Sequence, residues 1–127
     1  MTLRYQTERR AGYLHATIDG EFELAAALAA FRGIFHVAAG FGQPRILVDC
    51  TGVRGAMTPS DRLQLGTFMA DEQRVIAAQL PNGPRIAILA VPPIMDPGRF
   101  TQTVANNRGV RMRASESLQE LLSWLGV

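Results

Sequence analysis

The run Met57-Thr58-Pro59-Ser60 carries two hydroxyl groups that could accept a phosphate at the start of an expected helix. Free backbone N–H groups and the helix dipole stabilise a phosphate at such a terminus. Thr58 is also a good helix cap, because Pro59 suits the first helical position and Asp61 follows the threonine by three residues. The pattern therefore predicts a cap at Thr58 and leaves Thr58 and Ser60 as candidate phosphoacceptors.

Asp49 ends a short apolar run, Arg45-Ile46-Leu47-Val48-Asp49-Cys50, which is typical of a strand covered on both faces. Its carboxylate could accept hydrogen bonds from the loop that begins at Thr51, or it could face a ligand. No second acidic residue lies near it in sequence to form an acid–base pair. We expect the capping role, and keep Asp49 and Thr51 as part of a candidate docking or ligand surface.

A second loop, residues 92–99, follows the most apolar strand candidate in the chain. One interpretation is an ordinary proline-rich connection. It could also form one wall of a groove shared with residues 51–58, because both loops follow parallel strands. The residues that would form this groove are Arg54 and Arg99, for an anionic group, and Met57, Ile94 and Met95, for an apolar body.

Cys50 is the only cysteine, so an intramolecular disulfide and a multi-cysteine metal site are excluded. A reactive thiol needs a nearby base, and nothing in the sequence places His15 or His36 beside Cys50. Two histidines twenty-one residues apart do not suggest a metal site either. We therefore predict no catalytic residues, no metal and no cofactor.

The 127 residues, 47% of them hydrophobic, fit one domain that spans residues 1–127. Formal net charge is +2, and the basic residues are all arginines spread along the chain, which does not indicate nucleic-acid binding. The apolar stretch at residues 24–35 is interrupted by Arg32 and is shorter than the roughly 20 residues that span a bilayer. A polar N-terminus and a single thiol favour a cytoplasmic protein.

Hydrophobic periodicity predicts nine elements in the order ββαβαβαβα. The expected strands are residues 4–9, 13–18, 45–50, 85–91 and 110–113, and the expected helices are 21–39, 59–79, 97–107 and 115–125. Asp19 or Gly20 is the expected cap of the first helix. Right-handed crossovers then give an α/β fold whose four- to five-stranded sheet is mostly parallel, with an antiparallel N-terminal hairpin.

With this element order, Ile46-Leu47-Val48-Asp49-Cys50-Thr51-Gly52-Val53 resembles the passage from strand to helix in the STAS domain family, and in particular its SpoIIAA-like branch. That group includes bacterial anti-sigma-factor antagonists. The endings are also similar, in a strand at residues 85–89, a helix start at Gly98-Arg99-Phe100 and Leu121-Leu122-Ser123-Trp124-Leu125. The resemblance implies one STAS-like domain.

Antagonists in this family carry a phosphorylatable serine in an Asp-Ser-Ser-Gly-like turn, where this sequence has Met57-Thr58-Pro59-Ser60. The resemblance implies a non-enzymatic regulatory module that binds a kinase-like or other regulatory protein through residues 51–61. Self-association as a homodimer is a further expectation, because the opening hairpin leaves a sheet edge exposed. The alternative function is binding of a small amphipathic or lipid-like anion between loops 51–58 and 92–99.

Overall fold

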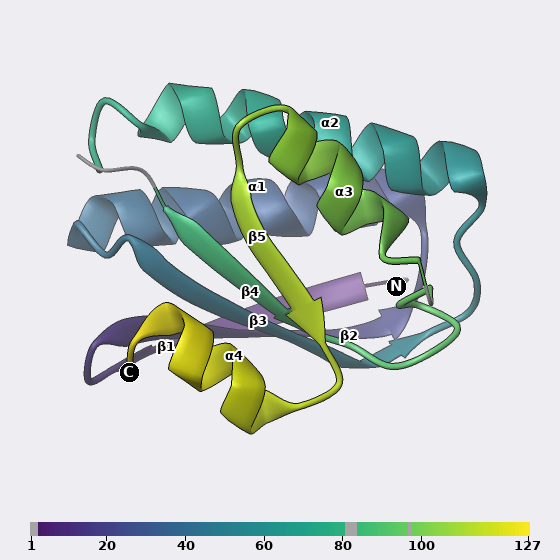
Figure 1. Cartoon of the computed structure of the whole chain (residues 1–127), viewed down its shortest axis with the longest axis horizontal. Helices are drawn as coiled ribbons and strands as arrows, with labels where there is room; N and C mark the ends of the chain where they lie inside the picture. Colours follow the sequence, from purple (N-terminus) through teal and green to yellow (C-terminus); the bar gives the residue numbers. More distant parts are fainter. Residues whose placement is uncertain (1–2, 81–83, 97) are drawn as a thin grey trace.

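A five-stranded sheet forms the centre of the computed structural model, which describes residues 3–80, 84–96 and 98–127 (Figure 1). The predicted order ββαβαβαβα is confirmed. In chain order the elements are β1 (Leu3–Arg10), β2 (Tyr13–Glu21), α1 (Leu24–Phe41), β3 (Arg45–Arg54), α2 (Pro59–Ile76), β4 (Arg85–Leu89), α3 (Phe100–Asn107), β5 (Arg111–Ser115) and α4 (Leu118–Leu125).

The strands lie in the order β1-β2-β3-β4-β5, so each crossover helix connects neighbouring strands. β1 pairs with β2 antiparallel, as the predicted hairpin requires, and the other three pairings are parallel. The carboxyl ends of β2 to β5 therefore meet at one end of the sheet. The loops after β3 and β4, which the sequence singles out, both begin there.

Helices cover the two faces of the sheet unequally (Figure 1). On one face, α1, α2 and α3 pack over a large core to which alternate residues of β3, such as Ile46, Val48 and Cys50, contribute. On the other face, α4 packs over a small cluster of four buried residues: Leu47, Ala87, Leu121 and Leu125. This two-sided burial explains why β3 reads as a nearly unbroken apolar run.

The first helix differs from its predicted bounds at both ends. It begins at Leu24 because β2 continues to Glu21, and Asp19 does not cap the helix but pairs with Arg4 at 2.7 Å. Gly40, just after the expected last residue 39, lies inside the helix. The chain turns instead at Gly42, whose φ of 65° is left-handed and whose N–H donates to the carbonyls of Ala38 and Ala39.

Three later boundaries also move. Residues 51–54, expected in a loop, extend β3 because residues 52–54 pair with residues 19–21 at the end of β2. The helix α2 ends at Ile76, three residues early, in a short turn. The helix α3 begins at Phe100, because the left-handed Arg99 (φ 48°) breaks the helix and the Asp96 carboxylate accepts the Phe100 N–H at 3.0 Å. Pro97, its expected first residue, lies outside the described residues.

The last strand and helix also shift by a few residues. β5 runs to Ser115 because it pairs along the whole length of β4. The helix α4 therefore begins at Leu118 instead of 115, and the Ser117 side chain caps it by accepting the Glu120 N–H. β4 itself ends at Leu89, two residues short of its prediction.

Side chains from α3 cover the free edge of β5. The Asn106 amide accepts the Met112 N–H at 2.9 Å and donates to the Met112 carbonyl at 3.2 Å. Gln102 accepts the Ala114 N–H at 2.7 Å. These side-chain amides bond to backbone groups of β5 that would otherwise pair with a neighbouring strand. They therefore protect this edge of the sheet from pairing with another chain.

By length and composition alone, α1 could cross a membrane. In the fold, however, one side of the helix, including Ile34 and Phe35, is buried in the main core. Its opposite side is exposed and carries Arg32, which pairs with Glu72 of α2 at 3.0 Å. These contacts make α1 a core helix of this domain.

Candidate functional site

The predicted cap of α2 is confirmed. Thr58 Oγ1 accepts the Asp61 N–H at 3.0 Å, and the Asp61 carboxylate accepts the Thr58 N–H at 2.9 Å, which completes a capping box. Pro59 occupies the first turn. The Thr58 hydroxyl is therefore already used by the helix that it begins.

Ser60, by contrast, uses its hydroxyl only at the surface, where it accepts a hydrogen bond from the Gln64 side chain at 3.0 Å. Both Thr58 and Ser60 are exposed. A phosphate on Ser60 would keep the capping box intact and would lie within the first turn of α2, where the helix dipole favours negative charge. Of the two candidate phosphoacceptors, Ser60 thus has the more available hydroxyl group.

Asp49 has the predicted capping geometry. Its Oδ1 accepts the Thr51 N–H at 2.9 Å and the Thr51 hydroxyl at 2.7 Å. Because strand residues alternate, Asp49 lies on the face of β3 that Leu47 shares with α4. Asp49 is therefore on the opposite side of the sheet from Met57, which packs on the main core.

The two arginines proposed for an anionic group lie in different settings. Arg54 ends β3 and pairs with Glu21 at 2.9 Å, and both side chains are largely exposed. Arg99 precedes α3 in a left-handed conformation, and its side chain is exposed. A non-glycine residue in that conformation is strained, and such strain is often found at functional sites.

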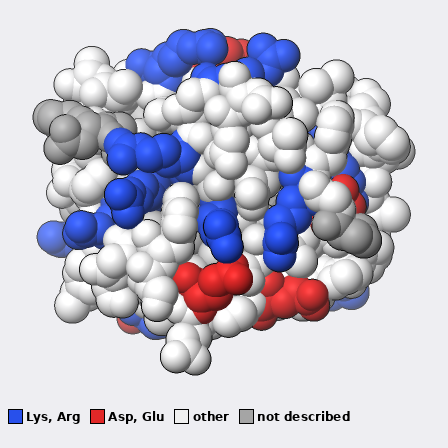
Figure 2. Space-filling view, in the orientation of Figure 1, with Lys and Arg blue, Asp and Glu red and all other residues white. Residues whose placement is uncertain are grey.

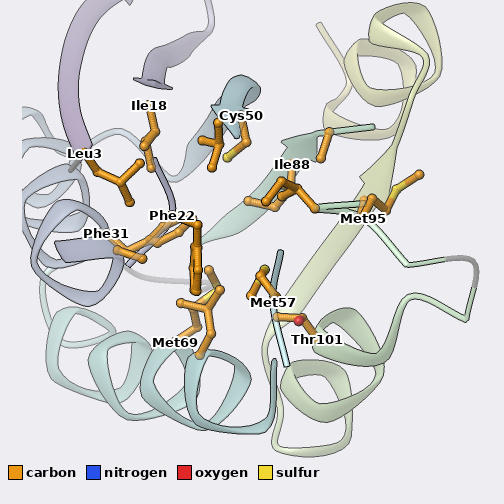
Figure 3. Close-up of a pocket in the computed structure, with 16 residues that line it drawn as sticks. Leu3, Ile18, Phe22, Phe31, Cys50, Met57, Met69, Ile88, Met95 and Thr101 are labelled. Atoms are coloured by element: carbon orange, nitrogen blue, oxygen red, sulfur yellow. The ribbon is translucent and has the colours of Figure 1, made fainter. Parts of the chain in front are cut away.

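The three apolar residues of the predicted groove lie together in the structure. Met57, Ile94 and Met95 line a cavity of about 80 Å³ between the main core and the loops that follow β3 and β4. Further lining residues (Figure 3) include Phe31 of α1, Cys50 of β3 and Met69 of α2, and also Phe22, which lies between β2 and α1. The structure therefore brings these three predicted residues together around one cavity, and binding of a ligand there stays a prediction.

Arg62, which the sequence analysis did not single out, connects the two loops beside this cavity. It lies in α2, is only 9% exposed, and donates to the carbonyls of Pro93 at 2.8 Å and Ile94 at 2.7 Å. Its guanidinium also lies 3.4 Å from the Asp96 carboxylate and 3.9 Å from the Met57 sulfur. A single side chain thus fixes both loops. Its spacing from Leu65 and Met69, three and seven residues, could have shown that it is on the buried face.

Cys50 and His15 are separated by the sheet. Cys50 is buried on the side of the main core, and burial, with a further contribution from the Asp49 charge, raises the pKa of its thiol to about 12. His15 alternates with Leu14 and Ala16 and so faces the other side. The cysteine therefore stays protonated at neutral pH, and His15 cannot act as its base.

Charged groups are distributed unevenly on the face in Figure 2, where arginines gather beside β4 and β5 and acidic residues lie below them near α4. Arg85 donates to the Trp124 carbonyl at 3.1 Å, and Arg113 lies 3.4 Å from Glu120. These arginines hold α4 against the sheet. Trp124 is partly buried and packs against the small cluster between α4 and the sheet.

The fold resembles a solved structure, a crystal structure of an anti-sigma factor antagonist from Mycobacterium paratuberculosis. The TM-score is 0.62 at 12% sequence identity, and the match covers 99% of this chain and 96% of that one. Comparisons with protein-family models and with curated proteins find no match. The likeness confirms the STAS-like fold. At this identity it shows the fold alone, and the function is argued from the site.

Proposed function

We propose that this chain, which has the fold of an anti-sigma factor antagonist, is a non-enzymatic regulatory module that binds a protein partner in the bacterial cytoplasm. The observation that carries the proposal is the exposed passage 51–61, which joins the end of β3 to the capped start of α2. The partner class that fits is a kinase-like or other regulatory protein. The buried, protonated Cys50 supports a non-enzymatic role.

Site-specific crosslinking tests this docking surface. A photoreactive amino acid placed at Ser60 in cells of the source organism should crosslink to one regulatory protein, identified by mass spectrometry. The same group at Gln119, an exposed position on α4, is the matched control. Adducts at both positions alike, or none from residues 51–61, would contradict the proposed surface.

We further propose that Ser60, rather than Thr58, is the residue that accepts a phosphate. Thr58 Oγ1 is bonded to the Asp61 N–H, and a phosphate there would lie next to the Asp61 carboxylate of the capping box. Trypsin cleavage after Arg54 and Arg62 places both residues in one peptide, and fragmentation distinguishes them. If this peptide from cells never carries phosphate, the phosphorylation proposal is wrong, while docking through residues 51–61 remains testable by crosslinking.

A second copy of the chain is the alternative protein partner. β1 forms one edge of the sheet, and β5, the other edge, is covered by Gln102 and Asn106. Any strand pairing between copies is therefore expected at β1. Light scattering that shows only monomer up to millimolar concentration would rule out the homodimer.

The apolar cavity favours a second candidate function, binding of a small amphipathic or lipid-like anion. Its alkyl part would contact Met57, Ile94 and Met95, and its head group would reach the exposed Arg99. Arg54 would have to exchange its partner Glu21 for the ligand. Decanoate should raise the melting temperature, and Arg99→Gln should reduce that rise; no thermal shift with decanoate would count against the function.

A further inference from the structure

The cavity beside Met57 differs from an ordinary packing gap in its size. Its volume of about 80 Å³ is several times the roughly 10–15 Å³ that a single water molecule requires. Its walls are almost entirely apolar, so water bound inside would lack hydrogen-bond partners. A void of this size also forfeits packing energy in a small domain, unless an apolar molecule fills it.

One residue with a hydroxyl side chain lies among the apolar residues that line the cavity. Thr101, in the first turn of α3, lines the cavity next to Met57 (Figure 3), and its Oγ1 is buried with no hydrogen-bond partner among the described residues. Buried hydroxyl groups almost always have a partner, because an unpaired one costs free energy. A ligand with one hydrogen-bonding group would supply the missing partner.

The walls can also adjust to a ligand. Three of the lining residues are methionines, Met57, Met69 and Met95, whose flexible and polarizable side chains fit varied apolar shapes. Phe22 and Phe31 add aromatic surface. The cavity is bounded by the loops that Arg62 holds through the Ile94 carbonyl and the Met57 sulfur.

We propose that this cavity is a binding site for a small neutral molecule, aromatic or short aliphatic, whose single polar group hydrogen-bonds to Thr101 Oγ1. The size suits about five to seven non-hydrogen atoms. This site has the same apolar lining residues as the anion site proposed above. It rests on that proposed function only in assuming that a ligand enters between the two loops. Binding of a neutral molecule requires no positively charged residue and depends only on Thr101 and the cavity walls. Binding of an anion depends on Arg99.

Phenol and toluene test this site, because they have similar shapes and only phenol has a hydroxyl group. Each is titrated into protein labelled with ¹³C at the methionine methyl groups. Saturable shifts are expected at Met57, Met69 and Met95. They are not expected at Met112, which packs in the main core but does not line the cavity. Shifts at Met112 alone, or none at the three lining methionines, would overturn the proposal.

Two substitutions in the cavity and one control sharpen the test. Thr101→Val should weaken phenol binding about threefold to tenfold and leave toluene binding unchanged or tighter. Thr103→Val makes the same change two residues later, at an exposed site whose hydroxyl bonds to the Arg99 carbonyl, and should alter neither affinity. Ala27→Leu fills the cavity and should abolish both.

Equal phenol affinities in Thr101→Val and Thr103→Val would show that Thr101 Oγ1 is not the ligand's partner. Unchanged toluene binding in Ala27→Leu would show that the ligand lies elsewhere. If Ala27→Leu fails to fold, the comparison of Thr101→Val with Thr103→Val still tests the proposal. If Arg99→Gln leaves the effect of decanoate on the melting temperature unchanged while phenol still binds, the anion site is rejected and the neutral site is retained.

Discussion

At the scale of single residues, the structure separates the two roles considered for the start of α2. Thr58→Ala should lower the free energy of unfolding by about 1 kcal/mol, because the helix loses its cap and the capping box. Ser60→Ala is the matched control and should change it by less than about 0.5 kcal/mol, since Ser60 is exposed. Urea denaturation measures both. Equal losses in the two variants would mean that the capping box contributes nothing to stability.

His15 makes the stability of the fold depend on pH. Burial, followed by the nearby Arg10 charge, lowers its pKa below 6.5, although Asp49 and Glu8 partly oppose this. Its Nδ1 is buried with no partner among the described residues. His15 therefore binds a proton more readily in the unfolded chain than in the folded chain. The free energy of unfolding is not reduced by His15 above pH 6.5, and it decreases as the pH falls below that value.

Urea denaturation at pH 7.5 and 5.5 measures this dependence. His15→Phe keeps the aromatic contact with Tyr13 but cannot be protonated, and it should remove much of the loss between these two pH values. His36→Phe, at an exposed site on α1, is the matched control and should retain the loss. A loss of equal size in wild type and His15→Phe would assign the pH dependence to another group.

Sequence patterns could find some of the site residues and not others, for physical reasons. Thr58 and Asp49 were identified because their caps use partners two or three residues away in sequence. Asp49 was nevertheless grouped with Met57, although strand alternation places it on the other face of β3. The role of Arg62 could not be predicted because its partners, the carbonyls of Pro93 and Ile94, lie thirty-one and thirty-two residues away in the sequence. Such partners are known only once the fold is known.

At the scale of elements, Arg62 connects α2 to the loop after β4. Arg62→Leu removes its hydrogen bonds to two loop carbonyls and its contact with Asp96, and should cost about 2–4 kcal/mol. Arg74→Leu, on the same helix, breaks only an exposed pair with Asp71 and should cost less than about 0.5 kcal/mol. Equal costs would show that the buried contacts add no stability.

The same variant should change the local dynamics of the loop. Amides at Ile94 and Met95 should exchange with solvent faster in Arg62→Leu than the global loss of stability explains, because Arg62 holds this segment directly. Exchange that increases only in step with global unfolding would limit Arg62 to a role in overall stability.

Element boundaries show what local patterns leave out. The apolar spacing predicted every helix and strand, but β3 extends through residues 51–54 because β2 extends beside it. Gly52 favoured a loop in the sequence, yet its lack of a side chain is what lets it approach the Cβ of Asp19 closely. Pairing between strands thus overrides local propensity, and pairing partners cannot be identified within a short window.

At the scale of the whole molecule, the two faces of the sheet differ in how firmly they are covered. Three helices share the main core, whereas α4, only eight residues long, packs two buried leucines against Leu47 and Ala87 and has two arginine contacts. Less apolar surface has to be exposed to release α4 than to open the main core. We therefore expect α4 to detach at a lower free energy than global unfolding requires.

Native-state hydrogen exchange distinguishes the two openings. Ile34→Val, in the main core, should lower the protection of the slowest sheet amides by about 1 kcal/mol and leave α4 protection unchanged, because the α4-detached state keeps that core. Leu121→Ala should lower α4 protection by about 3 kcal/mol, since Leu121 is fully buried beneath the helix. If Ile34→Val lowers the protection of α4 and of the sheet equally, α4 opens only when the whole molecule unfolds, and the two faces form one cooperative unit.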